Sequence, residues 1–311
     1  MIRLDHNQPM PESLRGAIIA LGNFDGFHRG HQAVVGEALR WAADEGRPAI
    51  VATFDPHPAQ IFKPDIEPFC LTTLDQRQEL FASAGADAML VFHFDIAMAS
   101  MTPAEWVNQV IARHLGAAGV VTGEDFTFGK GRGGNPAVLA ELGAENGVAA
   151  RAVGGVHDDV GAISSSRIRA ALQAGDCEEA KRLLTRPFAI RGVVQHGDKL
   201  GRTIGFPTAN LPLGGYLRPR FGIYAVTGKL PGGRILQGAA NLGVRPTFDP
   251  PKELLEPFFF DFSGDLYGQE IEVAFHHFIR PEAKFASMDE LIAQIGRDCD
   301  EAQARLAALI P

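Results

Sequence analysis

Short apolar runs alternate with amphipathic stretches along the first part of the chain. The runs are apolar on both faces, as strands of a covered parallel sheet are, and span residues 17–23, 49–54, 88–94, 119–122 and 149–153. Between and after them, apolar residues recur at helical spacing over residues 31–43, 75–84, 103–114, 136–146, 165–174 and 176–184. This alternation predicts an α/β domain over residues 1–184, with a parallel sheet covered by helices.

The pattern changes near Thr185. Glycine and proline become frequent up to Arg280, and the apolar segments become short. Residues 271–275 alternate apolar and polar positions with a period of two, which is typical of a half-buried strand. A last helical pattern covers residues 288–309. We therefore expect a second domain over residues 185–311, built as an antiparallel barrel or sandwich and followed by a helix.

Composition limits the kind of partner. The length of 311 residues suits two domains, and the net charge of -8 argues against duplex nucleic acid, which requires clustered Lys and Arg. The three cysteines, Cys70, Cys177 and Cys299, form no CxxC pair, so neither a disulfide framework nor a zinc site is expected. The sequence shows no signal peptide and no apolar run of the roughly 20 residues that a membrane span needs. A cytoplasmic protein is expected.

Candidate chemistry first appears at residues 22–31, GNFDGFHRGH, between a predicted strand and a predicted helix. The spacing of His28 and His31 lets both side chains face the same way at the start of that helix. A helix N-terminus has free N–H groups and partial positive charge, which suit a phosphate, and Gly26 and Gly30 permit close approach of the backbone. Taken alone, the stretch also fits a tight turn with two solvated histidines.

This stretch resembles the HxGH signature of the nucleotidyltransferase superfamily, and residues 163–169, ISSSRIR, look like its second signature, ISSTxxR. Ser166 replaces the usual threonine and keeps the hydroxyl. The resemblance implies a Rossmann-like domain in which an acceptor phosphate attacks the α-phosphorus of ATP and releases pyrophosphate. It implies that the phosphates are contacted by His28, His31, Asn23, Ser164, Ser165 and Arg169.

Two further loops follow strand ends, at residues 53–58 and 123–129. Both resemble segments that border the flavin and adenine pockets in the bacterial flavin-adenylating branch of that superfamily. The implied flavin-side residues are Phe54, Asp125, Phe126 and Phe128. Core packing competes for at least one of the three phenylalanines, because large aromatic side chains are commonly buried.

The second candidate site is residues 197–210, GDKLGRTIGFPTAN. Thr208 and Asn210 point to the same side of an extended chain and supply neutral oxygens that suit a hard cation such as Mg²⁺. Gly201 and Gly205 would let backbone amides approach phosphates. Without further context, the stretch is a glycine-rich loop that enters a strand.

The same stretch closely resembles the riboflavin kinase signature, and residues 221–225, 241–248 and 261–268 match later blocks of that family in order. The resemblance implies an antiparallel β-barrel in which Glu256 is the general base for the ribityl 5′-hydroxyl. It also implies that Arg280 begins a flavin-side segment. Pro257 departs from the family pattern, and because it lacks an N–H it suggests an edge strand or a bulge beside Glu256.

The resemblance spans nearly the whole chain, which is identified as a member of the bacterial bifunctional riboflavin kinase and FMN adenylyltransferase (FAD synthetase) family. It implies phosphorylation of riboflavin to FMN with ATP and Mg²⁺, and then adenylylation of FMN to FAD with a second ATP. The expected partners are riboflavin, FMN, FAD and ATP, without nucleic acid or membrane, and the expected state is a monomer or weak homo-oligomer. Two alternatives stay open: a single-activity enzyme with one decayed domain, and a non-enzymatic flavin carrier.

Overall fold

The computed structural model describes residues 1–196, 204–245 and 252–307. The chain divides into two compact units. The first unit consists of residues 1–67 and 74–164, and the second consists of residues 68–73 together with the described residues from 165 onward. The two helices of residues 165–184 thus belong to the second unit, although the amphipathic pattern alone grouped them with the first. The domain boundary after residue 184 stays a prediction.

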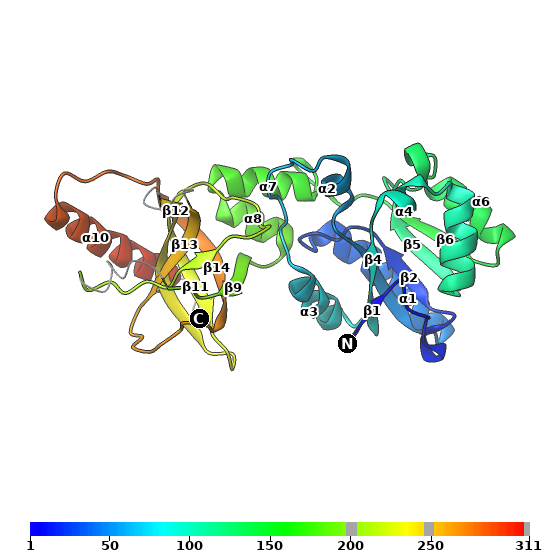
Figure 1. Ribbon diagram of the computed structural model, residues 1–311, viewed down its shortest axis with the longest axis horizontal. Helices are drawn as coiled ribbons and strands as arrows, with labels where there is room; N and C mark the ends of the chain where they lie inside the picture. Colours follow the sequence, from blue (N-terminus) through cyan, green and yellow to red (C-terminus); the bar gives the residue numbers. More distant parts are fainter. Residues whose placement is uncertain (197–203, 246–251, 308–311) are drawn as a thin grey trace. The chain divides into compact units, whose positions relative to one another are not determined.

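The first unit contains a parallel sheet of six strands in the order β1-β4-β3-β2-β5-β6 (Figure 1). The strands are β1 Ile2–Asp5, β2 Ile18–Leu21, β3 Ala49–Asp55, β4 Ala88–His93, β5 Gly119–Gly123 and β6 Ala149–Val153. All five predicted strands are confirmed. The apolar pattern did not indicate β1, because this edge strand is mostly exposed and carries charged residues.

Helices cover both faces of this sheet, as predicted. Ile18 and Ala20 of β2 pack in one apolar cluster with α1 (Arg29–Glu45) and α3 (Leu74–Ala84). Ile19 and Leu21 face the opposite cluster, which contains the π-helical segment η2 (Trp106–His114) and α6 (Pro136–Glu145). Because alternate residues of a strand point to opposite faces, a strand buried on both sides must be apolar throughout.

Shorter elements connect these layers. They are η1 Glu12–Leu14, α2 Pro58–Phe62, α4 Ile96–Ser100, α5 Pro103–Glu105, η3 Lys130–Arg132, β7 His157–Asp158 and β8 Gly161–Ala162. The helix predicted over residues 103–114 begins as α5, which Thr102 caps together with Glu105 in a capping box, and it continues as η2.

From residue 165 onward, the second unit consists of α7 (Ser165–Ala174), α8 (Cys177–Leu184) and an antiparallel sheet in the order β10-β13-β12-β11-β14-β9. Its strands are β9 Phe188–Val193, β10 Leu211–Pro212, β11 Gly222–Lys229, β12 Ile235–Arg245, β13 Lys252–Phe259 and β14 Glu270–Arg280. The Gln195 N–H donates to the Asn210 carbonyl over 2.8 Å and joins the two ends of the sheet. This contact makes a near-closed barrel.

The barrel core and the last helix follow the predicted patterns. Ile271, Val273 and Phe275 of β14 are buried at alternate positions. Tyr224 is fully buried, with its ring centroid 4.9 Å from that of Phe275, and burial raises the pKa of its hydroxyl. Helix α10 (Met288–Ala307) packs against the other face of β11 and β12 (Figure 1). Within the described residues, no helix combines the length and apolar character required to cross a membrane.

Packing between α1 and β5 gives a test of the first unit. A Cβ atom at Gly119 would lie 2.3 Å from the ring of Trp41, which is buried. We expect Gly119→Ala to lower the free energy of unfolding by about 1–3 kcal/mol through overpacking. Gly36→Ala is the matched control, because Gly36 lies inside α1 with its nearest neighbour at 3.5 Å, and alanine is the better helix former. Urea unfolding measures both, and equal stability of the two variants would contradict the packing argument.

Candidate active sites

The order of the parallel strands places two predicted loops together. The chain runs from β2 to β3 on one side, whereas β5 pairs with β2 on the other side. In open α/β sheets, ligands bind beyond the carboxyl ends of the strands where the order reverses. Residues 22–30 follow β2, and residues 124–129 follow β5, so both loops flank that point. The first unit therefore has a candidate site where the motifs predicted it.

The two histidines of the first loop lie face to face. The ring centroids of His28 and His31 are 3.6 Å apart, with 21° between the ring planes. His28 is buried and caps α1, because its Nδ1 accepts hydrogen bonds from the N–H groups of Gly30 and His31 over 3.1 and 3.4 Å. The expectation that these N–H groups are free for a phosphate is thus wrong. A proton on the neutral His28 ring belongs on Nε2, since Nδ1 accepts.

The loop before the histidines is held in a costly conformation. Phe24 and Phe27 have positive φ angles of 47° and 45°, a region that side-chain-bearing residues rarely occupy. Both rings are buried, with their centroids 5.9 and 5.1 Å from that of Phe81 on α3. Burial of two aromatic side chains offsets the backbone strain. The histidines thus follow a loop that the core of the first unit keeps in place.

The beginning of the second signature lies against this loop. A Cβ atom on Gly30 would lie 3.3 Å from the carbonyl oxygen of Ile163 and 3.0 Å from His28 Cε1, so a larger residue would fit tightly here. Ser164 follows directly and ends the first unit. Ser165 and Arg169 lie on α7 in the second unit, where the Arg169 Nε donates to the Phe69 carbonyl over 2.9 Å.

The predicted flavin-side residues divide between core and surface. Phe54 and Phe128 are buried in the apolar cluster below the loops, with Phe54 stacked on Phe92. Phe126 is half-buried, and Asp125 is exposed. Core packing therefore takes two of the three rings, which leaves Phe126 and Asp125 as the accessible members of the set.

Two polar residues that the motifs did not reveal support the same loop. Thr53 is buried at the end of β3, and its hydroxyl donates to the Asn23 carbonyl over 2.7 Å. The Arg77 Nη1 on α3 donates to Thr53 Oγ1 over 2.8 Å and to the same carbonyl over 3.3 Å. The Asn23 side chain itself is exposed. No local sequence signal marks Arg77, because its amphipathic helix pattern predicts only an ordinary surface or core position.

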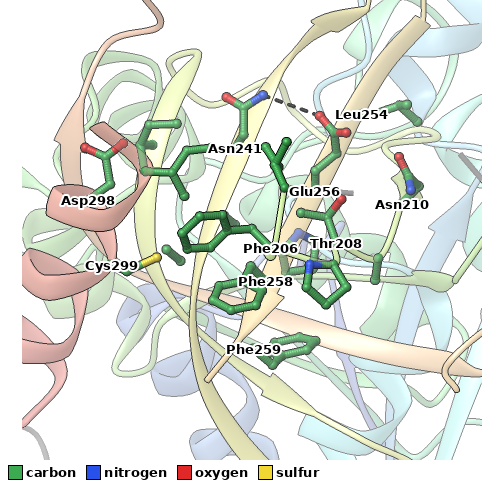
Figure 2. A pocket seen from close by; sticks show the side chains of 18 of the residues that line it. Phe206, Thr208, Asn210, Asn241, Leu254, Glu256, Phe258, Phe259, Asp298 and Cys299 are labelled. Atoms are coloured by element: carbon green, nitrogen blue, oxygen red, sulfur yellow. Dashed lines mark hydrogen bonds between the residues drawn. The ribbon is translucent and has the colours of Figure 1, made fainter. Parts of the chain in front are cut away.

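The second unit contains a pocket of about 780 Å³ between the sheet and α10. This volume suits a small-molecule ligand. The polar lining residues predicted from the sequence are Thr208, Asn210, Glu256 and Arg280, and the aromatic ones include Phe206, Phe258, Phe259, Phe262, Phe285 and Tyr267. Figure 2 shows Thr208, Asn210 and Glu256 on the same pocket. Side chains from distant parts of the chain thus converge on one cavity.

Strand register explains this convergence. Glu256 on β13 lies directly opposite Asn241 on β12, and Asn241 lies opposite Ile223 on β11, which in turn pairs with Arg280 on β14. On the other side of Glu256, Asn210 occupies the next position, because Leu211 pairs with Leu255. Residues directly opposite each other in an antiparallel sheet point to the same face. One row across the sheet therefore lines the pocket.

Asn241 is the neighbour of Glu256 that sequence reasoning missed. Its Nδ2 donates to Glu256 Oε2 over 3.4 Å, and both side chains are half-buried (Figure 2). Asn241 belongs to a block that matched the kinase pattern, but only the pairing of β12 with β13 brings it beside the carboxylate.

The prediction of an edge strand or bulge at Pro257 is wrong. β13 lies between β10 and β12, and its pairing with β12 continues without a shift through Pro257. The Pro257 carbonyl accepts from the Ala209 N–H over 3.0 Å, so it points away from β12. In a strand the N–H and C=O of one residue point to the same side, and the missing N–H of Pro257 therefore costs the ladder to β12 nothing.

Arg280 is engaged by the last helix. Its Nε and Nη2 donate to the two carboxylate oxygens of Asp298 on α10 over 2.8 and 2.6 Å, and Asp298 is buried. Such bidentate pairs are strong and directional. This pair fixes α10 beside the pocket. Cys299 on the same helix also lines the pocket, and burial, followed by the charges of Asp298 and Asp300, raises the pKa of its thiol to about 11. Arg280 thus lines the pocket with its charge already paired.

The remaining predicted positions are less informative. Gly201 lies outside the described residues. Gly205 is exposed, with a φ of 88° in the turn between Ile204 and Phe206, which both line the pocket. The residues that the structure describes contain no cluster of three or more His, Cys, Asp or Glu side chains suited to a metal ion.

The adjacent histidines of β14 contact different elements. His276 Nε2 lies 2.9 Å from Thr227 Oγ1 on β11, and His277 Nδ1 lies 3.0 Å from Glu178 on α8. Burial, followed by the charge of Lys181, lowers the pKa of His276 to about 4, so this ring is neutral near pH 7. The two rings have separate structural partners.

Two family models match successive parts of the chain. Residues 10–167 match the FAD synthetase family model, and residues 184–306 match the riboflavin kinase family model. The bifunctional riboflavin kinase/FMN adenylyltransferase of Escherichia coli (strain K12) is 40% identical over 307 residues, covering 96% of this chain and 95% of that protein. The protein of the same name from Bacillus subtilis (strain 168) is 39% identical, covering 92% of this chain and 91% of that protein.

A solved structure shares the fold. A crystal structure described as a macrolide-efflux protein from Streptococcus pneumoniae is 31% identical, with a TM-score of 0.84, and the match covers 96% of this chain and 97% of that one. Two family models in succession, and relatives that match over nearly their whole length, lead to one conclusion. The chain belongs to the bifunctional riboflavin kinase/FMN adenylyltransferase family and is an enzyme that converts riboflavin to FMN and FMN to FAD.

Proposed function

We propose that riboflavin is phosphorylated in the pocket between the barrel and α10, and that FMN is adenylylated at the loop after β2. The observation that carries the first assignment is the row of Asn210, Glu256 and Asn241 in one cavity, with Thr208 beside it. The aromatic lining supports binding of a flat flavin ring, since aromatic side chains supply large apolar contact area.

In the kinase step, the Glu256 carboxylate accepts the proton of the ribityl 5′-hydroxyl as that oxygen attacks the γ-phosphorus of ATP. The bond from this phosphorus to the β–γ bridging oxygen breaks, and ADP leaves. An alcohol is a weak nucleophile at pH 7, so a carboxylate within hydrogen-bond reach assists the reaction. Asn241 donates a hydrogen bond to one carboxylate oxygen and so helps to orient the carboxylate toward the substrate.

The residues present fit Mg²⁺. Thr208 and Asn210 provide a hydroxyl and an amide oxygen on the pocket wall, and Mg²⁺ prefers oxygen ligands combined with substrate phosphates. We propose that these two side chains hold the ion. When bound, it neutralises charge on the ATP oxygens. Thr208 and Asn210 would orient the triphosphate relative to Glu256.

In the adenylyl step, an oxygen of the FMN phosphate attacks the α-phosphorus of ATP and pyrophosphate leaves. This oxygen is already ionised at pH 7, so no general base is required. His28 and His31 would donate hydrogen bonds to the phosphates as charge moves onto the leaving group. The proposed phosphate contacts also include Asn23, Ser164, Ser165 and Arg169, and Phe126 and Asp125 would border the flavin.

Several broader features belong to the same proposal. Residues 1–184 would form the adenylyltransferase domain, and residues 185–311 would form the kinase domain. The enzyme would act in the cytoplasm as a monomer or weak homo-oligomer, without nucleic acid as a partner. The acidic net charge supports the last point.

Removing the proposed base tests the kinase assignment. We expect Glu256→Gln to lower kcat for FMN formation by about 10²- to 10⁴-fold, because the amide cannot accept the hydroxyl proton. FAD formation from supplied FMN should stay near the wild-type rate. Glu270→Gln, at an exposed glutamate that begins β14, is the matched control. Chromatography of the flavin products measures both reactions, and wild-type FMN formation by the Glu256 variant would rule the base out.

The hydrogen bond from Asn241 makes a separate prediction. We expect Asn241→Leu to lower kcat for FMN formation by about tenfold, the typical worth of a hydrogen bond to a charged group, and to leave the KM for riboflavin nearly unchanged. In the Glu256→Gln background the same substitution should have no further effect, because the two residues act together. Steady-state kinetics of the wild type, the two single variants and the double variant measure this coupling. Independent effects of the two substitutions would show that Asn241 and Glu256 do not act together.

The histidine pair can be tested without losing the helix cap. We expect His28→Asn and His31→Ala each to lower kcat for FAD formation by about 10²- to 10³-fold, with FMN formation retained. Asparagine still accepts the hydrogen bonds of the helix N-terminus, so His28→Asn should unfold at nearly the wild-type temperature. If this variant makes FAD at the wild-type rate, His28 only caps α1.

A further inference from the structure

Arg77 is a buried cation within the first unit. It lies on α3 with 5% of its surface exposed. Its Nη1 donates to the Thr53 hydroxyl and to the Asn23 carbonyl, and the Thr53 hydroxyl donates to the same carbonyl. Two of these bonds end on the Asn23 carbonyl, in the loop that leads to His28 and His31. The network ties α3 and β3 to the proposed phosphate site.

Among the described residues, no neighbouring side chain neutralises the charge of Arg77. In the described part of the chain, no carboxylate forms an ion pair with Arg77, and its Nε has no hydrogen-bond partner. Removing a guanidinium from water without an opposite charge is expensive. Other arginines of the same unit, such as Arg3, Arg40 and Arg151, are more exposed and pair with carboxylates. An uncompensated buried cation next to a loop is therefore a feature that a bound anion would stabilise.

A purely structural role would not require this arrangement. A neutral donor such as glutamine can bond a hydroxyl and a carbonyl, and it avoids the cost of burying a charge. A buried cation at this position is explained if its electric field acts on an anionic ligand that binds at the loop. The backbone strain at Phe24 and Phe27 points the same way, because a loop under strain has to be held in its working shape.

We infer that Arg77 is a positioning residue for adenylyl transfer: it fixes the Asn23 carbonyl and supplies the positive field that draws the ATP polyphosphate to the loop. This inference rests on the proposed site at His28 and His31. Arg77 acts through the loop and through its field, and no direct contact with the nucleotide is required.

Two substitutions separate charge from hydrogen bonding. Arg77→Lys keeps the cation, and Arg77→Gln keeps a donor without charge. We expect Arg77→Gln to lower kcat/KM for ATP in FAD formation by about 10- to 100-fold, whereas Arg77→Lys should retain most of it. Added KCl should also slow FAD formation by the wild type more than FAD formation by Arg77→Gln. Salt screens the electric field of Arg77, and the Gln variant lacks this field.

The chain provides its own controls. FMN formation also uses ATP, but we place it at the other proposed site. The rate of FMN formation in the same preparations should therefore be unchanged. Arg40→Gln removes an exposed charge from the same unit and should leave FAD formation unaffected. The inference is overturned if the Lys and Gln variants of Arg77 behave alike, or if FMN formation falls equally. If FAD formation survives in the His28 and His31 variants, the proposed site itself is wrong, whatever the Arg77 variants do.

A third variant keeps the test decisive if neither Arg77 protein folds. Thr53→Val has nearly the same volume and removes only the hydroxyl that joins Arg77 to the Asn23 carbonyl. We expect kcat for FAD formation to fall by about tenfold, with the KM for ATP little changed, because the charge remains. An unchanged kcat would show that the network does not position the loop.

Discussion

The hydrogen-bonded pairing of β13 with β12 holds Glu256 opposite Asn241, and the proposed kinase pocket depends on this register. A shift by one residue would turn every side chain of β13 to the other face, so Glu256 would leave the pocket and Leu255 would enter it. The register with β12 survives Pro257 because the carbonyl of Pro257 accepts from the Ala209 N–H before β10, so the missing donor also faces away from β12. The bridge between Gln195 and Asn210 then closes the barrel and brings Asn210 to the same row.

The last helix completes this pocket through one ion pair. Arg280 ends the row across the sheet. Its Nε and Nη2 donate hydrogen bonds to Asp298 on α10. Breaking a buried pair by removing one partner leaves an uncompensated charge, which is costly. The pair therefore couples the position of α10 to the strand that carries Arg280. Sequence resemblance assigned Arg280 to the flavin side, whereas the structure gives its charge to the helix that encloses the cavity.

The two sites differ because their acceptors differ. A hydroxyl must lose a proton to attack phosphorus, and the proposed kinase pocket offers a carboxylate with a neighbouring amide donor for this step. A phosphate carries its negative charge before it reacts, so the other site requires only positive charge and hydrogen-bond donors. His28, His31 and the buried Arg77 suit that second demand. The first unit has a strained loop and a buried arginine that forms no ion pair within the described residues, whereas the proposed site of the second unit depends on strand register.

Local sequence determined much of this protein. Apolar periodicity marked the covered parallel strands and the helices, because burial on both faces or on one stripe leaves a direct pattern. The HxGH stretch and the kinase signature marked His28, His31, Thr208 and Asn210, because chemistry at strand ends and turns requires particular residue types, whereas Glu256 was assigned from the resemblance to the riboflavin kinase family. Only tertiary structure showed that Asn241 lies beside Glu256 and that the Nδ1 of His28 caps α1. It also showed that buried Arg77 forms no ion pair with a carboxylate among the described residues. Each of these depends on contacts between elements far apart in the chain, which hydrophobic periodicity and local motifs do not encode.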